Sequence, residues 1–460
     1  MEDSTNSIRK PGPKTASRRP WQWHKIALAL VLIIPRAALI WIAFAQPSRC
    51  IFPDSPGYLD LASSLREEGR FHASAYEESL RTPVYPAFLA LVELAFGERV
   101  GPIALLQILL TLVTAWILFR AGREIAGERA GLAAAWLYAL NPNALFWSCT
   151  ILTETLFAFW LILALYLLAT GLRRRSLPRA ATSGLTLGLA VLTRPIGLYL
   201  IPLWGAGALL ALWTSSDRRR AIAFTTALLA SALVSIFAWQ ARNYVVQGHF
   251  RVTASFRTVF IDYTAASTLG DALGIPRDEA ATRLRQSPDA FAAAMAVVRE
   301  YPTSFVRETL RGIARTVLGT EAGTWMGILT GGEYHSSGLL ESLLRADWGG
   351  VARALSTRMQ QAQDRLGTVL LAWGVLYAIG LYACAFVGLL RARHLQPPGS
   401  RWVVLAVALS AMYLIVVPLT IGDARFRLPA EPSLALLGAL AFARPAPRPD
   451  SESDGMGGGR

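Results

Sequence analysis

Long apolar segments separated by polar connections dominate the chain. The longer segments reach the roughly 20 residues that a helix needs to cross a bilayer. Mean hydropathy is +0.38, and only 17% of the residues are charged, whereas soluble domains average about 25%. The pattern predicts an all-α polytopic membrane protein with about ten transmembrane helices, and the runs at 181–193 and 430–443 need flanking residues to span. The ten apolar runs are 26–46, 100–119, 131–148, 150–170, 181–193, 195–213, 221–240, 367–390, 402–421 and 430–443.

Basic residues fall on alternate connections between these segments. Cytoplasmic loops carry the excess of Lys and Arg, so the alternation predicts that both termini are cytoplasmic. A basic tail (1–25) and a Pro/Ser/Gly-rich tail expected to be disordered (444–460) then flank a membrane domain (26–443) in the plasma (inner) membrane. The loops explain the formal net charge of +14, and no nucleic-acid-binding motif accompanies it.

Two of the connections on the opposite, non-cytoplasmic side are long, namely 47–99 and 241–366. In the first, the spacing of Leu59, Leu61, Ala62 and Leu65 predicts a short amphipathic helix. An apolar stretch that ends at Phe96 predicts a helix at the membrane surface. In the second, 291–298 and 305–317 are amphipathic and carry interspersed arginines. We expect amphipathic helices in both outer loops.

Two acidic residues stand beside apolar segments on this outer side. Asp54 follows the first segment, and Glu154 opens the fourth. Ionisable groups at membrane depth are costly and usually mark a functional site. Both residues are therefore candidate catalytic groups. The structural alternatives are that Asp54 caps a turn, and that Glu154 caps its helix or pairs with an arginine.

Several arginines accompany the acids at outer helix ends. Arginine binds phosphate through two parallel hydrogen bonds and stays charged at any working pH. Several arginines and one or two acids on one face suit a phosphorylated lipid, although each arginine could instead anchor its helix at the interface. Tyr58 and Tyr85 are expected to line the same site. The candidate phosphate ligands, in falling order of preference from Arg194, are Arg194, Arg242, Arg81, Arg425 and Arg427.

The three cysteines form no disulfide framework and no metal cluster. Cys50 and Cys149 both fall on the outer side of the predicted topology, which leaves one disulfide between them open. Cys384 lies within a later apolar segment.

At several points the sequence resembles the GT-C fold glycosyltransferases, in particular the bacterial branch related to protein O-mannosyltransferases and to the lipid A aminoarabinose transferase. Each motif is weak alone, but their order and topological placement make the combination fairly specific. The motifs are Asp54-Ser55-Pro56-Gly57-Tyr58, Arg81-Thr82-Pro83-Val84-Tyr85-Pro86, Leu140-Asn141-Pro142, Thr153-Glu154-Thr155, Gly188-Leu189-Ala190-Val191-Leu192-Thr193-Arg194-Pro195, Arg242-Asn243-Tyr244 and Arg425-Phe426-Arg427-Leu428-Pro429.

The resemblance implies a reaction. Such enzymes transfer a sugar from a polyprenyl-phosphate donor to a lipid, glycan or protein acceptor on the outer face, usually with inversion. The resemblance maps the family's first-loop aspartate onto Asp54, which would act as general base or orient the acceptor. It maps the family's second acid onto Glu154, which could lie beside a divalent metal ion. The family often has paired acids in the first loop, but Ser55 follows Asp54 here, so metal use stays open.

Two other functions are compatible with the same residues. A transporter or flippase for a lipid-linked saccharide also needs outer arginines, but it is expected to show repeated halves with broken helices, and the sequence has no repeat of fixed period. A non-catalytic membrane scaffold would tolerate the loss of Asp54. The three hypotheses therefore differ in what they predict for Asp54.

Overall fold

The computed structural model describes residues 21–73, 80–213, 218–332, 338–360, 365–393 and 399–443. Every regular element in these ranges is a helix, which confirms the all-α membrane class. The tails predicted at 1–25 and 444–460 lie outside the described residues, except that 21–25 open the first helix.

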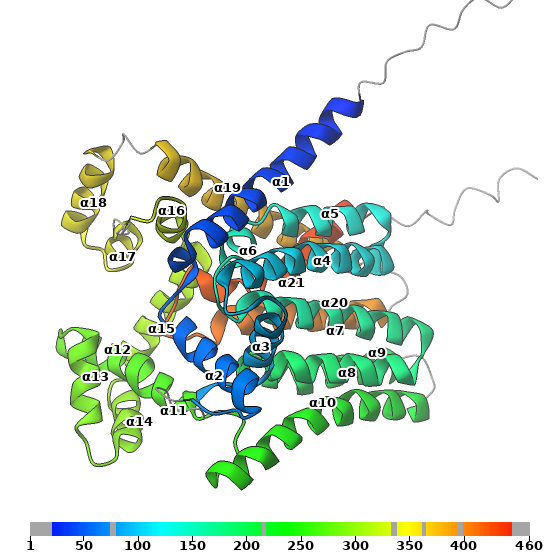
Figure 1. The fold of residues 1–460 in the computed structure, drawn as a ribbon, viewed down its shortest axis with the longest axis horizontal. Helices are drawn as coiled ribbons and strands as arrows, with labels where there is room; N and C mark the ends of the chain where they lie inside the picture. The colour runs from blue at the N-terminus through cyan, green and yellow to red at the C-terminus, as the bar shows by residue number, and fades with distance from the viewer. Residues whose placement is uncertain are drawn as a thin grey trace, which may run out of the picture.

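Each of the ten apolar segments forms one helix or two consecutive helices (Figure 1). The segment 131–148 divides into two helices because Pro142 starts a new one. Asn141 caps the N-terminus of this second helix, since its side chain accepts hydrogen bonds from the Asn143 and Ala144 N–H groups. The helices are α1 (Trp21–Ala45), α4 (Val100–Ala126), α5 (Glu128–Ala139), α6 (Pro142–Trp147), α7 (Glu154–Arg174), α8 (Leu177–Val191), α9 (Leu200–Trp213) with the preceding 3₁₀ turn η3 (Pro195–Tyr199), α10 (Arg218–Gln247), α19 (Arg365–Ala392), α20 (Gly399–Val416) and α21 (Glu431–Ala439).

Five of these elements are long and apolar enough to cross a membrane, namely α4, α7, η3 with α9, α10 and α19. Shorter apolar stretches of 10–17 residues lie at Leu30–Ala45 in α1, Val84–Phe96, Arg401–Val416 in α20 and Glu431–Phe442. Length and composition therefore account for five of the ten crossings that the sequence predicts.

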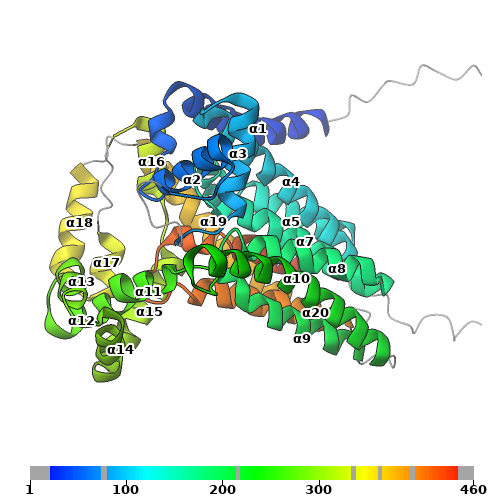
Figure 2. The same ribbon diagram turned by 60° about the horizontal axis from the view of Figure 1, so that its bottom comes forward.

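The apolar helices pack side by side in a bundle, seen from two directions in Figures 1 and 2. Helix α7 contacts α4 and α8, α8 contacts α10, and α9 contacts both α10 and α20. At the other side, α21 packs against α5 and α19. One large apolar core runs through these contacts, with Phe157, Trp204 and Phe224 buried in it.

Glycine permits a close contact between α8 and α10. A Cβ atom on Gly184 would lie 2.0 Å from the Leu228 carbonyl oxygen, and one on Gly188 would lie 2.3 Å from the Ser235 hydroxyl. In membranes, small residues let helix backbones approach and gain van der Waals contact, since the hydrophobic effect does not drive association there.

Both long outer loops contain the expected helices. The first loop forms α2 (Ser55–Glu68) and α3 (Val84–Phe96), and the predicted stretches at 291–298 and 305–317 lie in α14 (Ala290–Glu300) and α15 (Pro302–Leu318). The second loop also contains α11 (Ser255–Val259), α12 (Ala266–Leu273), α13 (Arg277–Arg285), α16 (Ala322–Thr330), α17 (Leu339–Leu344) and α18 (Trp348–Gln360).

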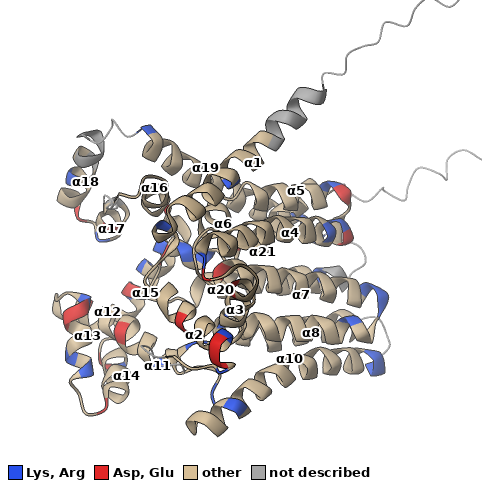
Figure 3. Ribbon diagram, in the orientation of Figure 1, with Lys and Arg blue, Asp and Glu red and all other residues tan. Residues whose placement is uncertain are grey.

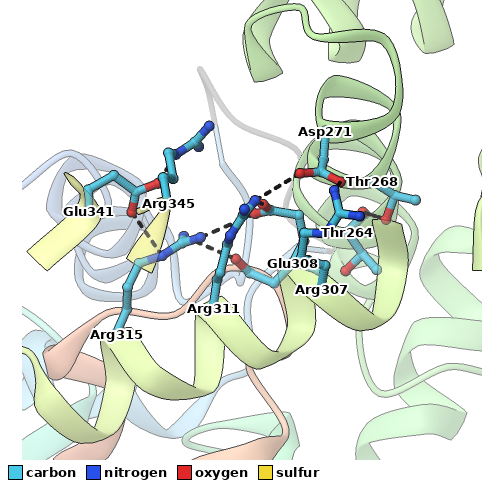
Figure 4. A network of polar contacts seen from close by, with 10 residues as sticks. Thr264, Thr268, Asp271, Arg307, Glu308, Arg311, Arg315, Glu341 and Arg345 are labelled. Atoms are coloured by element: carbon cyan, nitrogen blue, oxygen red, sulfur yellow. Dashed lines mark hydrogen bonds and ion pairs between the residues drawn. The ribbon is translucent and has the colours of Figure 1, made fainter. Parts of the chain in front are cut away.

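Ion pairs join the helices of the second loop (Figure 4). On α15, Arg311 contacts both Asp271 of α12 and Glu308, and Arg315 contacts Glu308 and Glu341 of α17. Helix α15 is therefore the element through which the loop helices are held together.

Charge is distributed unequally along the bundle. Many Lys and Arg positions lie at the end of the bundle away from α11–α18, on the right in Figure 3. They belong to the α4–α5, α7–α8 and α9–α10 connections, the ones that the sequence assigns to the cytoplasm. Their common location agrees with that topology.

We predict that Gly184→Ala lowers the melting temperature of the detergent-solubilised protein, because the added methyl group collides with the α10 backbone. Overpacking of this kind typically costs about 1–3 kcal/mol. The matched control is Gly380→Ala, since a Cβ atom there meets nothing within 4 Å. Equal melting temperatures for both variants would contradict the close contact between α8 and α10.

Candidate acid–arginine site

The loop that carries Asp54 is fastened to the segment that leads to Glu154. The Ser55 hydroxyl donates to the Ile151 carbonyl (2.9 Å) and accepts from the Phe52 N–H (2.9 Å). Asp54 occupies the position before α2, yet its side chain makes no capping hydrogen bond. The structure thus does not use Asp54 as a helix cap, and its carboxylate is available for other contacts.

Arg81 holds the Asp54 carboxylate from the turn before α3. Its guanidinium donates to Asp54 Oδ1 at 3.0 Å and to the Tyr58 hydroxyl at 3.1 Å, and it lies 4.4 Å from the centre of the Tyr58 ring. Tyr58 in turn packs edge-on against Tyr85, with ring centroids 5.1 Å apart. Tyr58 therefore positions Arg81 through a hydrogen bond and a cation–π contact.

Glu154 makes a buried ion pair with Arg194. Glu154 is the first residue of α7, and Arg194 precedes the turn η3. Arg194 Nη1 lies 2.6 Å from Glu154 Oε1, and the two side chains are only 14% and 3% exposed. Arg194 also donates to the Thr153 hydroxyl at 3.4 Å. The pairing alternative for Glu154 is thus realised, and it fixes the guanidinium beside the helix end.

Arg425 joins the two pairs. It comes from the turn η5 (Ala424–Arg427), and its guanidinium lies 3.6 Å from Asp54 Oδ2 and 3.5 Å from Glu154 Oε1. The guanidinium also lies over the rings of Trp147 and Phe426. Four distant segments therefore meet in one acid–arginine cluster, made of Asp54, Tyr58, Arg81, Glu154, Arg194 and Arg425.

Exposure separates the roles of the two acids. The Asp54 side chain is 42% exposed, against 3% for Glu154. Burial opposes ionisation of Asp54, but the positive charges of Arg81, Arg425 and Arg194 outweigh it and keep the pKa of Asp54 below its usual value. Asp54 is therefore an accessible carboxylate, whereas Glu154 is an enclosed counter-charge.

The cluster suits an anion better than a metal ion. Its three arginines outnumber its two carboxylates, and arginine nitrogens already lie within 3.6 Å of both acids. A divalent cation placed between the acids would meet these guanidinium groups at close range. Within the described residues, no three His, Cys, Asp or Glu side chains gather as a metal site. The donor set therefore does not fit the divalent ion that the sequence left open.

The comparisons with known proteins agree on a fold. A family model described as dolichyl-phosphate-mannose-protein mannosyltransferase matches residues 80–239. The oligosaccharyltransferase of Archaeoglobus fulgidus, crystallised with zinc and sulfate, superposes with a TM-score of 0.50 at 15% identity, covering 89% of this chain and 48% of its own. The chain has the GT-C fold. No curated protein sequence matches it significantly.

Two further GT-C structures superpose less well. ArnT from Cupriavidus metallidurans, bound to undecaprenyl phosphate, gives a TM-score of 0.41 at 17% identity over 92% of this chain and 78% of its own. The arabinosyltransferase EmbB from Mycobacterium smegmatis gives 0.34 at 17% identity, covering 81% of this chain and 42% of its own. This chain spans about half the length of the oligosaccharyltransferase structures that it matches.

Arg242 lies outside the acid–arginine cluster of this GT-C chain. Its guanidinium donates to the Phe71 carbonyl at 2.7 Å and to the Asn243 side chain at 3.2 Å. It also lies over the rings of Phe71 and Trp239. Arg242 therefore anchors the first outer loop to α10, and its role as a phosphate ligand stays a prediction from the sequence.

The polar groups of Arg427 and Tyr85 are bonded outside the cluster, although the Tyr85 ring packs against Tyr58. Arg427 is 3% exposed, pairs with Glu431 at 2.9 Å and donates to carbonyls near the end of α15. Tyr85 is fully buried and donates to the Gln107 side chain at 2.9 Å. Neither side chain is placed to line a substrate directly, because both are enclosed and already bonded.

A second pair of acids, Glu321 and Asp423, was not singled out from the sequence. Asp423 accepts from the Arg425 N–H at 2.7 Å, and Glu321 hydrogen-bonds to Asp423 and to Thr324. Both acids line a cavity of about 720 Å³. Burial and the neighbouring charge of Asp423 raise the pKa of Glu321 to about 8. Glu321 is therefore largely protonated at neutral pH, and the pair supports the turn that carries Arg425.

We predict a pH-dependent contribution of Glu321 to stability. Between the ordinary carboxyl pKa of 4.5 and the raised pKa of about 8, folded Glu321 keeps its proton while Glu321 in the unfolded chain loses it. Stability from this group therefore decreases as the pH rises through this range. Glu321→Gln mimics the protonated form, so the melting temperature of the wild type should fall more steeply from pH 5 to pH 8 than that of the variant.

The control for this comparison is Asp278→Asn, since Asp278 is 88% exposed. Its pH dependence should follow that of the wild type. Parallel curves for wild type and Glu321→Gln would show that Glu321 is ionised at neutral pH and would contradict its raised pKa.

Proposed function

We propose that this protein is a membrane glycosyltransferase that transfers a sugar from a polyprenyl-phosphate-linked donor to a lipid, glycan or protein acceptor on the non-cytoplasmic face. The observation that carries the proposal is the convergence of Arg81, Arg194 and Arg425 on one exposed and one buried acid. The GT-C fold, the matching family model and the carriers named in related structures support it.

The arginines suit the phosphate of the donor. Bidentate guanidinium groups stabilise the negative charge that grows on a leaving phosphate. Glu154 orients Arg194 and Arg425, because its carboxylate lies within 3.5 Å of both guanidinium groups. A phosphate group can take the place of water around these arginines. It can also replace the longer ion pairs, those of Arg425 with Asp54 and Glu154, without a change in the backbone.

Asp54 is the general base of the proposed reaction. Its carboxylate takes the proton from the acceptor hydroxyl, the acceptor oxygen forms a bond to the anomeric carbon, and the bond to the phosphate oxygen breaks. The electron pair leaves with the polyprenyl phosphate. A single displacement of this kind inverts the anomeric configuration. A general base must come within hydrogen-bond reach of the acceptor hydroxyl, so it has to be accessible from outside the protein. Asp54 is the more exposed of the two acids.

The outer-face location rests on the distribution of charge. The cluster is built from connections that the basic loops assign to the side opposite the cytoplasm. The basic loops themselves gather at the far end of the bundle (Figure 3). A lipid-linked sugar displayed on the outer leaflet would reach the arginines from that side.

We predict that Asp54→Asn lowers sugar transfer about a hundredfold or more, because a general base typically contributes this much to the rate. The assay uses membranes containing the native acceptor and a panel of radiolabelled polyprenyl-phosphate sugars, at matched expression. The control is Glu67→Gln, because Glu67 lies on the same helix and is 61% exposed at the surface. It should transfer at the wild-type rate.

Other outcomes would count against the proposal. Equal transfer by wild type and Asp54→Asn would remove Asp54 from the mechanism. Absence of transfer from every donor, together with movement of a labelled lipid-linked saccharide across vesicles, would favour the transporter.

A further inference from the structure

The fold brings two cysteines together beside the acid–arginine cluster. Cys50 ends the turn η1 (Pro47–Cys50), and Cys149 follows α6. Both side chains are completely buried, and they belong to one apolar cluster. Segments that are far apart in sequence therefore place their thiols in the same water-free environment.

A backbone hydrogen bond and a ring contact hold the segments around the two cysteines together. The Ile151 N–H donates to the Cys50 carbonyl at 3.0 Å, and the rings of Phe52 and Trp147 lie 5.1 Å apart. The two thiols are direct neighbours, and the Cys149 thiol donates its hydrogen bond to the Phe146 carbonyl at 3.1 Å. A bond between the sulfurs would thus need little movement of the backbone.

We propose that Cys50 and Cys149 form a disulfide that joins the loop carrying Asp54 to the segment carrying Glu154. The proposal uses the outward placement of these two segments, because disulfides form and persist on the oxidising side of the membrane. It does not require that the protein transfers sugar.

The oxidant is a protein disulfide on the outer face. The Cys50 thiolate attacks one sulfur of the donor, which forms a mixed disulfide and releases a donor thiolate. The Cys149 thiolate then attacks the Cys50 sulfur and releases the second donor thiolate. Two cysteines are oxidised, and the donor disulfide is reduced to a dithiol, because its two thiolates take up, through water, the two protons that the cysteines release. Because the finished fold buries both thiols, the exchange takes place while the outer segments are still folding.

The proposed disulfide lies close in sequence to both acids of the cluster. Asp54 lies four residues after Cys50, and Glu154 lies five residues after Cys149. A covalent bond there restricts the unfolded chain and keeps the two acids at a fixed separation. The ion pairs to Arg425, which depend on both acids, would then survive thermal motion of the first loop.

The test counts free thiols in the full-length protein. The parent variant is Cys384→Ser, which leaves only the proposed pair. Cells are quenched with acid, and the protein is denatured and treated with polyethylene-glycol maleimide before and after reduction. The proposal predicts no mass-shifted band before reduction and two added polymers after it. In Cys50→Ser with Cys384→Ser, one polymer should add without reduction.

Two results would overturn the proposal. One is the addition of two polymers to the parent variant without reductant. The other is a disulfide-linked dimer on a non-reducing gel that disappears in the Cys50→Ser variant, since this would show pairing between chains. Labelling is independent of transfer activity, so failure of this proposal and failure of the proposed function are distinguishable.

Discussion

The ion pair between Glu154 and Arg194 is the contact on which the candidate site depends. A carboxylate that is 3% exposed at the start of an apolar helix is very unfavourable unless a cation accompanies it. Arg194 supplies that cation, and Arg425 adds a second at 3.5 Å. This requirement draws the η3 and η5 turns toward α7, and Arg425 then extends the contact to Asp54. The cost of burying one charge therefore determines where four outer segments meet.

Small residues and buried polar groups support this arrangement from the bundle. Glycines in α8 allow α10 to approach closely. Asn141 and Asn143 donate to Glu431, which also pairs with Arg427. The Arg427 network holds the start of α21 next to the turn that carries Arg425. Removal of one partner from such a buried network leaves the others unsatisfied, so these residues act on the site through position rather than contact with a substrate.

Much of this could be predicted from the sequence, for identifiable reasons. Hydrophobicity located the ten apolar segments, and alternation of basic loops placed Asp54, Glu154, Arg81, Arg194 and Arg425 on one side. The structure brings these five together. Sequence could not give side-chain direction, which is why Arg427 and Arg242 resembled Arg425 and Arg194 as residues near outer helix ends. Nor could it show that Glu321 meets Asp423, because that contact joins segments far apart in the chain and depends on how α16 packs.

The central claim is that the three arginines form a phosphate site and that Asp54 competes with the phosphate for them. The most direct measurement is the affinity of the purified protein for a polyprenyl phosphate, by titration in detergent at fixed ionic strength. Loss of the negative charge in Asp54→Asn should tighten binding, because Arg81 and Arg425 lose a counter-charge, whereas Arg425→Gln should weaken it about tenfold or more, as expected for a charge-assisted hydrogen bond. Unchanged affinity in both variants would contradict the account.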